Sequence, residues 1–321
     1  MVNKIVTVVM TTYNGEKYVI QQLDSLRKQT RPVDELIISD DGSTDSTVEI
    51  CQNYIRKYEL YNWHFYVNNK NNGWIYNFHR CIEKQKGDYI FFCDQDDVWS
   101  DQKVERMIDI LDRNSDISVL CCGVNLVDSE GKSIQKKMNL PFVSNNTGKL
   151  YKYSANRRLT YSIFPGCTML VRNELIELMK EFTEKWEIPH DSYYWKAGVL
   201  MNKAAFLDEA LICYRIHGNN ASNPIASTAH RVKSIESRVN EVILFKTNME
   251  YFRSIFSKLD SFEIDKKRCL IILNDIVEYE DKRELFLRGT GSTFMYILKY
   301  YKYYQSWKML IGDLLCRLRN V

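Results

Sequence analysis

The sequence predicts an α/β protein in which a mostly parallel sheet is flanked by helices and followed by a helical extension. Apolar, strand-like runs alternate with amphipathic helical patterns through the first hundred residues, which is typical of parallel strands joined by crossover helices. Polar clusters directly follow three of these runs, at the strand ends where open sheets bind their ligands. From about residue 226 the pattern is helical to the end of the sequence, which predicts the extension.

The expected elements follow in order along the chain. Strands are expected at residues 5–12, 36–39, 65–67 and 89–93, with helices at 16–29, 46–58 and 76–85 between them. A helix near 104–111, a strand at 119–127, a strand within 165–171 and helices at 174–186 and 192–200 come next. Residues 128–159 are polar and lack a clear period, so we expect a mobile excursion there. We divide the chain into a domain of residues 1–225 and a helical region of residues 226–321.

Composition narrows the class of protein. Hydrophobic residues make up 45% and charged residues 26% of the chain, which is ordinary for a soluble globular protein. A net charge of +3 is too small to indicate a nucleic-acid partner. The nine cysteines lack a CxxC pair or zinc spacing, so we expect reduced core residues in a cytoplasmic protein. The sequence shows no N-terminal signal peptide and no membrane-spanning stretch.

The most informative stretch is Asp94-Gln95-Asp96-Asp97-Val98-Trp99, which follows the apolar run 89–93. Clustered carboxylates repel one another and resist burial, so they need a cation, ligand hydroxyls or water. Hard oxygen ligands at a strand end suit Mg²⁺ or Mn²⁺, and either ion can hold a diphosphate. The alternative is a solvated acidic loop that caps the helix beginning near Gln102.

Two further polar clusters are expected at the same edge of the sheet. Residues 11–14 follow the first strand and residues 40–45 follow the second. Together with residues 94–97 they indicate a nucleotide site beyond the carboxyl ends of the strands. Because neither GxGxxG nor a P-loop motif follows the first strand, a dinucleotide-binding or P-loop site is disfavoured.

Four features together resemble the inverting glycosyltransferases of family 2, which have the Rossmann-like GT-A fold. They are Thr12-Tyr13-Asn14-Gly15, the run Asp40-Asp41-Gly42-Ser43-Thr44-Asp45, the run 94–99, and Tyr214-Arg215 with His217-Gly218-Asn219-Asn220. The resemblance covers about residues 4–225. The form Asp-Gln-Asp-Asp-Val-Trp, together with His190-Asp191, is similar to the bacterial rhamnosyltransferase branch that builds surface polysaccharides.

The resemblance implies a role for each residue on the donor side. The residues that would bind the nucleotide are Thr12, Tyr13, Asn14, Asp41, Asn77 and Asp96. Asp41 would accept a hydrogen bond from the base, and Asp96 would contact the ribose. Asp97 would coordinate the metal on the diphosphate, and Asp94 would support the site or have a structural role. The residues alone leave open strand-end packing for Thr12 and Tyr13, a turn cap for Asp41 and a helix-surface position for Asn77.

The resemblance also implies a general base on the acceptor side. An inverting displacement needs one carboxylate to take the proton of the acceptor hydroxyl and a cation to stabilise the departing diphosphate. Asp191 would be that base, and a simple helix cap is the alternative. His190 is expected to pack against its neighbours or to face the acceptor rather than to act as a base.

Four more residues have two readings each. Arg215 would neutralise phosphate oxygens, and His217 would ligate the metal or touch phosphate. An ordinary surface loop is the alternative for His217. Trp74 and Trp99 would line the sugar pocket, although core packing is the more frequent role of such residues.

These residues predict metal-dependent transfer of a sugar, with inversion, from a nucleotide-diphospho sugar to a hydroxyl of a glycan acceptor. The branch implies dTDP-L-rhamnose as donor, a lipid-linked acceptor and a surface polysaccharide as product. A UDP-hexose or UDP-N-acetylhexosamine donor stays open, because no residue identifies the base or the sugar. The absence of a glycine-rich basic loop disfavours a nucleotidyltransferase, and the presence of both Asp97 and Asp191 disfavours a non-catalytic binding protein.

The basic character of the chain belongs to its last segment. Residues 285–321 hold six basic residues and one acid, and residues 294–307 include five tyrosines. Aromatic rings beside cations suit the headgroup region of an anionic membrane, which predicts peripheral association with the inner face of the cell membrane. A homodimer interface or a helix packed on the preceding domain is the alternative, because aromatic residues occur all round the helix.

Overall fold

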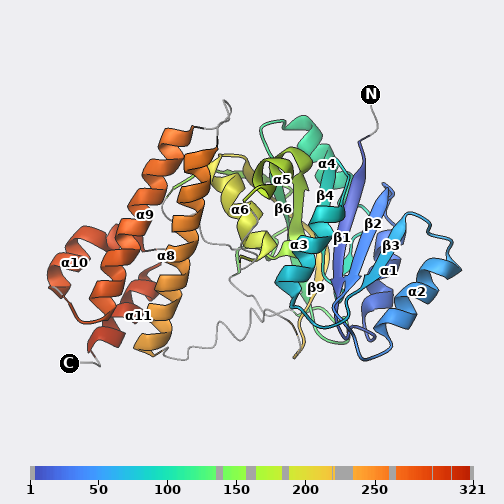
Figure 1. Cartoon of the computed structure of the whole chain (residues 1–321), viewed down its shortest axis with the longest axis horizontal. Coiled ribbons are helices and arrows are strands. Elements are labelled where there is room, and N and C mark those ends of the chain that lie inside the picture. Colours follow the sequence, from blue (N-terminus) through green and yellow to red (C-terminus); the bar gives the residue numbers. More distant parts are fainter. Residues whose placement is uncertain are drawn as a thin grey trace. The chain divides into compact units, whose positions relative to one another are not determined.

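The computed structural model describes residues 4–134, 140–156, 164–182, 188–218, 220, 234–259, 265–290, 292–304 and 306–318. The chain forms two compact units (Figure 1). The first unit comprises Met1–Tyr153 with Ser162–Ala221, and the second comprises Ser154–Tyr161 with Ser222–Val321. The domain boundary expected near residue 225 lies outside the described residues.

A sheet that has nine strands within the described residues is the centre of the first unit. Its strands are β1 (Val6–Thr12), β2 (Glu35–Asp40), β3 (Trp63–Val67), β4 (Tyr89–Cys93), β5 (Val98–Trp99), β6 (Val119–Val127), β7 (Leu150–Tyr153), β8 (Met169–Arg172) and β9 (Ala204–Arg215). Their order across the sheet is β3-β2-β1-β4-β8-β6-β9-β5, and β7 pairs with β9. The strands β3, β2, β1 and β4 run parallel, as the crossover pattern predicts.

Helices cover both faces of this sheet, so the α/β class predicted from the sequence is confirmed. The helices of the first unit are α1 (Val19–Arg27), α2 (Thr47–Lys57), α3 (Trp74–Lys84), α4 (Lys103–Arg113), α5 (Asn173–Lys180) and α6 (His190–Leu200), with a 3-10 turn η1 (Gly166–Thr168). Helix α6 contacts both α3 and α5, and α1 packs on α2 away from them (Figure 1). Because the central strands are covered twice, β4 is buried along its whole length.

The half of the sheet beyond β4 is mixed, unlike the mostly parallel sheet expected from the sequence. Strand β8 runs antiparallel to both β4 and β6. Strand β9 pairs parallel with β6 and antiparallel with β5 and β7. The sequence analysis missed β9, which has 12 residues. Its centre carries Asp208-Glu209, two acids that interrupt the apolar pattern by which strands are recognised.

Asp208 also explains why the segment expected to be a mobile excursion is anchored where it is described. The Asp208 carboxylate accepts hydrogen bonds from Ser144 Oγ at 2.8 Å, Asn145 N at 2.8 Å and Thr147 Oγ1 at 2.6 Å. Strand β7 then continues the segment along β9. The expectation of a mobile excursion is therefore wrong for residues 140–153, while residues 135–139 and 157–159 lie outside the described residues.

The second unit is helical in its described residues. Its elements are α8 (Ile235–Lys258), α9 (Lys266–Leu287), α10 (Thr293–Tyr300), the 3-10 turn η2 (Tyr301–Tyr303) and α11 (Trp307–Leu318). The two long helices α8 and α9 pack along each other. Among the helices that the structure describes, none combines the length and the apolar character needed to cross a membrane.

A buried acid joins the C-terminal helix to the long helices. Asp313 of α11 lies 2.7 Å from Arg238 Nη1 of α8 and 2.7 Å from Arg283 Nε of α9. It also accepts a hydrogen bond of 2.9 Å from the Tyr304 hydroxyl. Tyr279, Phe286 and further tyrosines pack around these groups. The carboxylate is thus fully paired inside the unit, which is the condition for burying a charge without a large penalty.

Candidate active site

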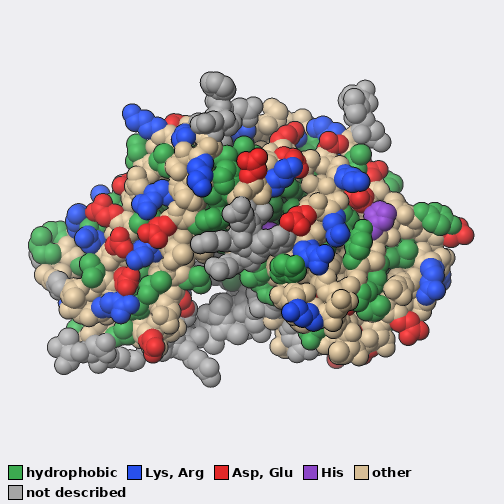
Figure 2. All heavy atoms as spheres, in the orientation of Figure 1, with side chains coloured by type: hydrophobic (Ala, Val, Ile, Leu, Met, Phe, Trp, Pro, Cys, Tyr) green, Lys and Arg blue, Asp and Glu red, His purple; other side chains and the backbone are tan. Residues whose placement is uncertain are grey.

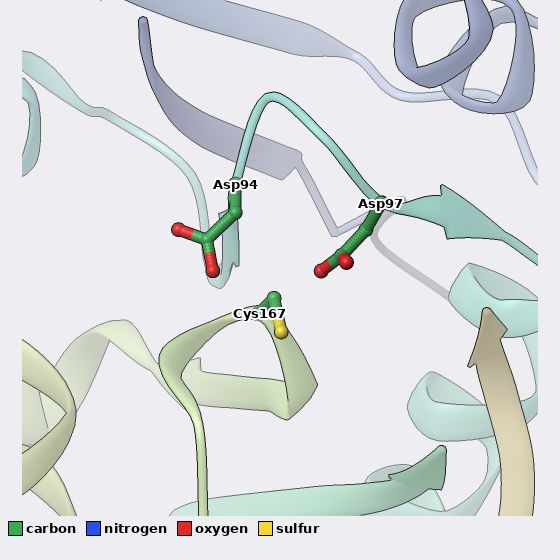
Figure 3. Close-up of side chains that lie close together, drawn as sticks. All are labelled: Asp94, Asp97 and Cys167. Atoms are coloured by element: carbon green, nitrogen blue, oxygen red, sulfur yellow. The ribbon is translucent and has the colours of Figure 1, made fainter. Parts of the chain in front are cut away.

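The acidic turn that follows β4 carries the group of side chains that matters most. Strand β4 ends at Cys93, and the turn of residues 94–97 leads into β5. The carboxylates of Asp94 and Asp97 and the thiol of Cys167 face one another, with ligand atoms within 4.8 Å of each other (Figure 3). Cys167 lies in η1, directly before β8, and β8 pairs with β4. The pairing of these two strands therefore brings Cys167 to the acidic turn.

Asp97 is a buried carboxylate with only one of its oxygens satisfied. Its Oδ1 accepts a hydrogen bond of 2.9 Å from the backbone N–H of Arg215, whereas its Oδ2 has no hydrogen-bond partner. Burial, together with the charges of Asp96 and Asp94, raises the pKa of Asp97 well above its ordinary value. A buried, unpartnered carboxylate oxygen is costly, and a bound cation would remove that cost.

The donor set fits a hard divalent cation. Two carboxylates, Asp94 and Asp97, offer the oxygen ligands that Mg²⁺ and Mn²⁺ prefer. Burial raises the pKa of the Cys167 thiol well above its usual range, so this thiol stays protonated and is a poor ligand for such an ion. His217 is not in this group, and its Nε2 lies 2.7 Å from Asp96 Oδ2. Its expected role as a metal ligand stays a prediction.

Asp191 shares the electrostatic environment of the acidic turn. Burial and the charges of Asp96 and Asp191 raise the pKa of Asp94 to about 7. Burial likewise raises the pKa of Asp191, although hydrogen bonds from the Ser192 and Gly166 backbone oppose the shift. The charge of Asp191 therefore acts on the acidic turn, although the two motifs lie far apart in the sequence. A carboxylate whose pKa is raised toward neutrality is a better proton acceptor than an ordinary surface aspartate.

The position of Asp191 follows from the start of α6. Pro189 precedes the helix, and Asp191 lies in its first turn, where the helix dipole favours a negative charge. One turn further, the buried ammonium of Lys196 donates a hydrogen bond to Ser192 Oγ. Burial lowers the pKa of Lys196 to about 8, although the charge of Asp191 opposes this shift. Lys196 is therefore a buried cation whose charge interacts with that of Asp191, and it was not predicted from the sequence.

The structure places His190 in a packing position. Its ring centroid is 3.9 Å from that of Phe78 and 4.6 Å from that of Phe92. Neither ring nitrogen has a hydrogen-bond partner, and burial holds the pKa of His190 well below its ordinary value. Gly166 lies against the same ring, because a Cβ there would come within 2.4 Å of His190 Nε2. The neutral imidazole thus fills the space behind Asp191.

The turn after β1 is tied to the acidic turn by a residue that the sequence analysis did not single out. The side chain of Gln95 accepts a hydrogen bond from Tyr13 N and donates one to Tyr13 O, each at 2.9 Å. Gly15 leaves room for it, since a Cβ on Gly15 would lie 2.1 Å from Gln95 Oε1. The Tyr13 ring itself is 44% exposed. Tyr13 is therefore held by its backbone and offers its ring at the surface.

Thr12 and Asn14 organise the neighbouring loop. Thr12 Oγ1 donates to Asp40 Oδ2 at 2.8 Å, and Asp40 Oδ1 accepts from Ser43 N at 2.7 Å. Asn14 has a φ of 47°, in the left-handed region, and its Oδ1 accepts from Thr44 N at 2.9 Å. These bonds join the ends of β1 and β2 into one surface.

Asp41 and Asn77 hold the loop between β3 and α3. Asp41 is buried, and its carboxylate accepts from Asn72 N at 3.0 Å and from Gly73 N at 2.8 Å. Asn77 is buried as well, and its amide bonds Ser39 Oγ at 2.6 Å and Ser39 O at 2.7 Å. The alternative of a helix-surface position for Asn77 is therefore wrong.

The guanidinium of Arg215 is buried beside the acidic turn. It donates to the carbonyl of Asp96 and to Gln21 Oε1 at 2.7 Å each, and it lies over the Tyr18 ring. The backbone N–H of Arg215 holds Asp97, as described above. Arg215 therefore holds the acidic turn through Asp96 and Asp97, and the phosphate contact expected from the sequence stays a prediction.

The two candidate tryptophans have different surroundings. Trp99 is 2% exposed and lies in the core, with the ammonium of Lys103 3.2 Å from its ring centroid. It does not line a sugar pocket. Trp74 is 40% exposed and meets the His190 ring edge-on, at 6.3 Å between centroids. Of the two rings, only Trp74 has a face available to a sugar.

The buried Lys103 is a further residue that sequence reasoning missed. Its ammonium donates a hydrogen bond of 2.7 Å to the carbonyl of Cys167. Burial lowers its pKa, while the neighbouring thiols and Asp97 oppose that shift. No sequence signal marks it, because Lys103 begins an ordinary amphipathic helix and its contacts come from η1 and β5.

Comparison with known proteins fits this geometry. Residues 7–179 match the family model described as glycosyl transferase family 2. The chain belongs to this family. The glycosyltransferase is 28% identical over 304 residues to an uncharacterized glycosyltransferase of Rickettsia typhi, which covers 85% of this chain and 90% of the relative. It is 29% identical over 224 residues to the dTDP-rhamnosyl transferase RfbG of Shigella flexneri, which covers 66% of this chain and 72% of that protein.

Solved structures share the fold of the glycosyltransferase. S. aureus TarS in complex with UDP-GlcNAc matches with a TM-score of 0.57 and 19% identity, over 97% of this chain and 79% of that chain. The mannosyltransferase PcManGT from Pyrobaculum calidifontis, in complex with GDP-Man and Mn²⁺, matches with a TM-score of 0.52 and 13% identity, over 98% and 87% of the two chains. The expected GT-A-type fold is confirmed, and the protein is a family 2 glycosyltransferase.

Proposed function

We propose that this glycosyltransferase transfers L-rhamnose from dTDP-L-rhamnose, with inversion and with the help of a divalent cation, to a hydroxyl of a glycan acceptor. The single observation that carries the proposal is the pair of neighbouring carboxylates, Asp94 and Asp97, beside the end of β4, where the charge of Asp191 also helps to raise the pKa of Asp94. The pair suits a cation on the leaving diphosphate, and Asp191 suits a base for the incoming hydroxyl.

The chemistry assigned to Asp191 is proton transfer. The acceptor oxygen attacks the anomeric carbon from the face opposite the diphosphate, and the bond from that carbon to the diphosphate oxygen breaks. The bond's electron pair leaves with the nucleoside diphosphate, and the acceptor's proton passes to Asp191. The raised pKa of Asp191 supports this role, because its affinity for a proton is closer to that needed near neutral pH.

Asp97 and Asp94 are the residues that would hold Mn²⁺ or Mg²⁺. A cation bound there would neutralise charge on the diphosphate as it leaves. The buried Oδ2 of Asp97, which has no hydrogen-bond partner among the described residues, supports this assignment. Arg215 and Gln95 would keep the turn in place through their contacts to Asp96, Asp97 and Tyr13.

The nucleoside would lie across the ends of β1 and β2. The residues that border this region are Thr12, Tyr13, Asn14, Asp41, Asn77 and Asp96. The exposed Tyr13 ring is free to stack on the base, whereas Asp41 and Asn77 would act through the loop that they hold. The ribose contact proposed for Asp96 shares its carboxylate with His217.

The similarity to RfbG, whose name describes a dTDP-rhamnosyl transferase, supports rhamnose as the sugar. The alternative donor is UDP-N-acetylhexosamine or a UDP-hexose, and the TarS complex with UDP-GlcNAc supports it at the level of fold. We further propose that the acceptor is a lipid-linked glycan of surface polysaccharide synthesis, which would bring the protein to the inner face of the cell membrane.

The base is tested by replacing Asp191 with Asn. We expect Asp191→Asn to lower the transfer rate by about 10²- to 10⁴-fold, the usual contribution of a general base, while Mn²⁺-dependent donor binding persists. The measurement is release of nucleoside diphosphate with and without Mn²⁺. Glu174→Gln, an exposed acid on α5, is the matched control and should behave as wild type. Equal and metal-indifferent background in wild type and Asp191→Asn would favour a non-catalytic binding protein.

The donor is tested by thermal stabilisation with a panel of nucleotide sugars in the presence of Mn²⁺. We expect dTDP-L-rhamnose to raise the melting temperature more than UDP-glucose, UDP-galactose or UDP-GlcNAc. A larger shift with a UDP sugar would replace the rhamnose assignment and leave the transferase mechanism intact.

A further inference from the structure

The elements α10, η2 and α11 carry two separate sets of apolar side chains, one buried in the second unit and one exposed. On the inner side, Tyr296, Tyr300 and Tyr304 are buried and pack with Tyr279 and Phe286 of α9. Phe286 and Tyr296 are stacked, with ring centroids 4.2 Å apart. These tyrosines are therefore core residues of the second unit. They leave a second set of apolar side chains, from the same elements, with no place in that core.

The second set is exposed and regularly spaced. Its members on α11 are Trp307, Ile311, Leu315 and Leu318, which recur every three or four residues and so lie along one side of the helix. Met295 and Leu298 have the same relation on α10. Trp307 is 68% exposed and Leu318 is 70% exposed, which is unusual for side chains of this size.

The exposed side chains of the two helices belong to one face. Tyr301 of η2 and Trp307 at the start of α11 are stacked, with ring centroids 6.4 Å apart. Both rings are exposed. This contact joins the α10 residues to the α11 stripe. We call the resulting surface, made of Met295, Leu298, Tyr301, Trp307, Ile311, Leu315 and Leu318, the exposed apolar face.

The exposed charged residues that α10, η2 and the start of α11 contribute beside this face are lysines. Lys299, Lys302 and Lys308 are exposed among or next to its apolar residues. The only acid of residues 292–318 is Asp313, which is buried and paired with Arg238 and Arg283. From α9, Glu278 reaches Lys299 at 3.9 Å, a loose and solvent-exposed pair of little energetic weight. The exposed side chains that these elements contribute to the face are thus apolar and basic. On the side of the molecule drawn in Figure 2, hydrophobic, basic and acidic side chains are intermingled.

We infer that the exposed apolar face docks on the surface of an anionic lipid bilayer. Tyrosine and tryptophan rings prefer the headgroup region, aliphatic side chains insert just below it, and lysines contact anionic headgroups. A second copy of this chain fits less well, because two such faces would bring like charges together at the interface. The inference gives a defined surface to the membrane association proposed above and rests on that part of the proposal.

The experiment measures binding of the full chain to sedimenting vesicles of phosphatidylcholine with and without phosphatidylglycerol. We expect binding only with the anionic lipid. Ile311→Glu with Leu315→Glu should reduce the partition coefficient at least about tenfold, because the two aliphatic side chains that would insert into the bilayer are lost. Leu244→Glu with Ile271→Glu, which changes two exposed apolar residues of α8 and α9, is the matched control and should bind as wild type.

The lysines are tested in the same assay. Replacing Lys299, Lys302 and Lys308 with Gln should weaken binding by about fivefold for each charge removed, since one basic residue near an anionic surface contributes about 1 kcal/mol. Replacing the exposed Lys258, Lys267 and Lys282 of α8 and α9 removes the same total charge elsewhere. This control should bind nearly as wild type. Equal losses in both triple variants would overturn a localised docking face.

A spectroscopic readout locates the face directly. Brominated lipids should quench fluorescence in wild type, and Trp307→Phe should remove most of that quenching. Wild-type protein that binds no anionic vesicles, or an apolar variant that changes only a monomer–dimer equilibrium in solution, would overturn the inference. Release of nucleoside diphosphate is measured without vesicles in parallel. A docking variant that keeps this activity separates a failure of docking from a failure of the proposed transferase chemistry.

Discussion

Asp97 and Asp313 are both buried carboxylates, yet their surroundings are opposite. Asp313 lies between Arg238 and Arg283 and also accepts a hydrogen bond from Tyr304. Asp97 has one backbone hydrogen bond, an oxygen with no partner, and further acids as neighbours. The first arrangement is what a protein needs to bury a charge stably. The second is unfavourable for the protein alone, and it is the arrangement expected where a cation and a diphosphate complete the site.

The comparison shows how to separate structural acids from functional ones. Both residues would look alike in a list of buried aspartates. The hydrogen-bond partners of each oxygen and the sign of the neighbouring charges distinguish them, because a structural acid is stabilised as an anion by its own fold. An acid of a binding site is instead stabilised by a positive charge that the ligand brings when it binds.

The largest expected effect on stability comes from replacing the structural acid, Asp313. Asp313→Asn should lower the free energy of unfolding of the second unit by about 3–5 kcal/mol, because Arg238 and Arg283 are left without their shared anion. Urea denaturation followed by circular dichroism measures it. Asp281→Asn breaks an exposed pair with Lys246 in the same unit and should cost less than about 1 kcal/mol. Equal, small losses in both variants would contradict the contrast drawn here.

In contrast to Asp313→Asn, Asp97→Asn should not lower the free energy of unfolding. In the absence of metal it removes a buried, poorly compensated charge, so we expect unchanged or increased stability, by about 1–3 kcal/mol. The same variant should lose the rise in melting temperature that Mn²⁺ gives wild type. Asp101→Asn, an exposed acid just beyond the turn, is the control and should change neither property. A clear destabilisation of metal-free Asp97→Asn would show that this carboxylate is structural.

The raised pKa of Asp94 should determine how the stability of the metal-free protein changes with pH. The folded pKa of Asp94, about 7, lies above the unfolded value near 3.9, so the folded state keeps a proton that the unfolded state has released. Stability of the metal-free protein should therefore fall as pH rises from about 4 to 7, by about 1–2 kcal/mol after allowance for solvent screening. Urea midpoints across this range measure the slope. Asp94→Asn should flatten it, and an unchanged slope in that variant would assign the effect to another group.

Replacing Asp208 should have the smallest effect on stability, and its contribution to stability should change with pH in the opposite direction to that of Asp94. Burial alone would raise the pKa of Asp208, but hydrogen bonds from Thr147, Ser144 and the Asn145 backbone hold the pKa below its ordinary value. Its stabilising effect is present above the unfolded pKa near 3.9 and is lost as pH falls further. Asp208→Asn should cost about 1 kcal/mol at pH 7, and urea midpoints should show the difference shrinking below pH 4. A difference that persists at acid pH would mean that the loop is held by packing.

The sequence was most informative where local pattern and topology agree. The parallel strands β1 to β4 and their helices could be predicted, because each has an apolar run or stripe bounded by turn residues. Strand β9 could not, because Asp208 and Glu209 interrupt its pattern and its register is set by β6, β5 and β7. The acid cluster was accessible as separate motifs. Gln95, Cys167 and Lys103 were not, because each acts through a contact with a segment remote in the sequence.

The tail shows the same division in another form. Composition revealed an aromatic and basic segment, but a helical pattern that is apolar all round could not say which side faces inward. Burial of Tyr296, Tyr300 and Tyr304 against α9 decided that, and it left the exposed apolar face as a separate feature.

By itself the sequence determined the α/β class, the acidic turn after β4 and the resemblance to family 2 glycosyltransferases, since these depend on local periodicity and on motifs of adjacent residues. The tertiary structure alone decided that Cys167 and Asp94 stand beside Asp97, that Arg215 faces inward and that the tail has two distinct sides. The physical reason is that burial, pairing and electrostatic coupling depend on what surrounds a side chain, and those surroundings come from strands and helices far apart along the chain.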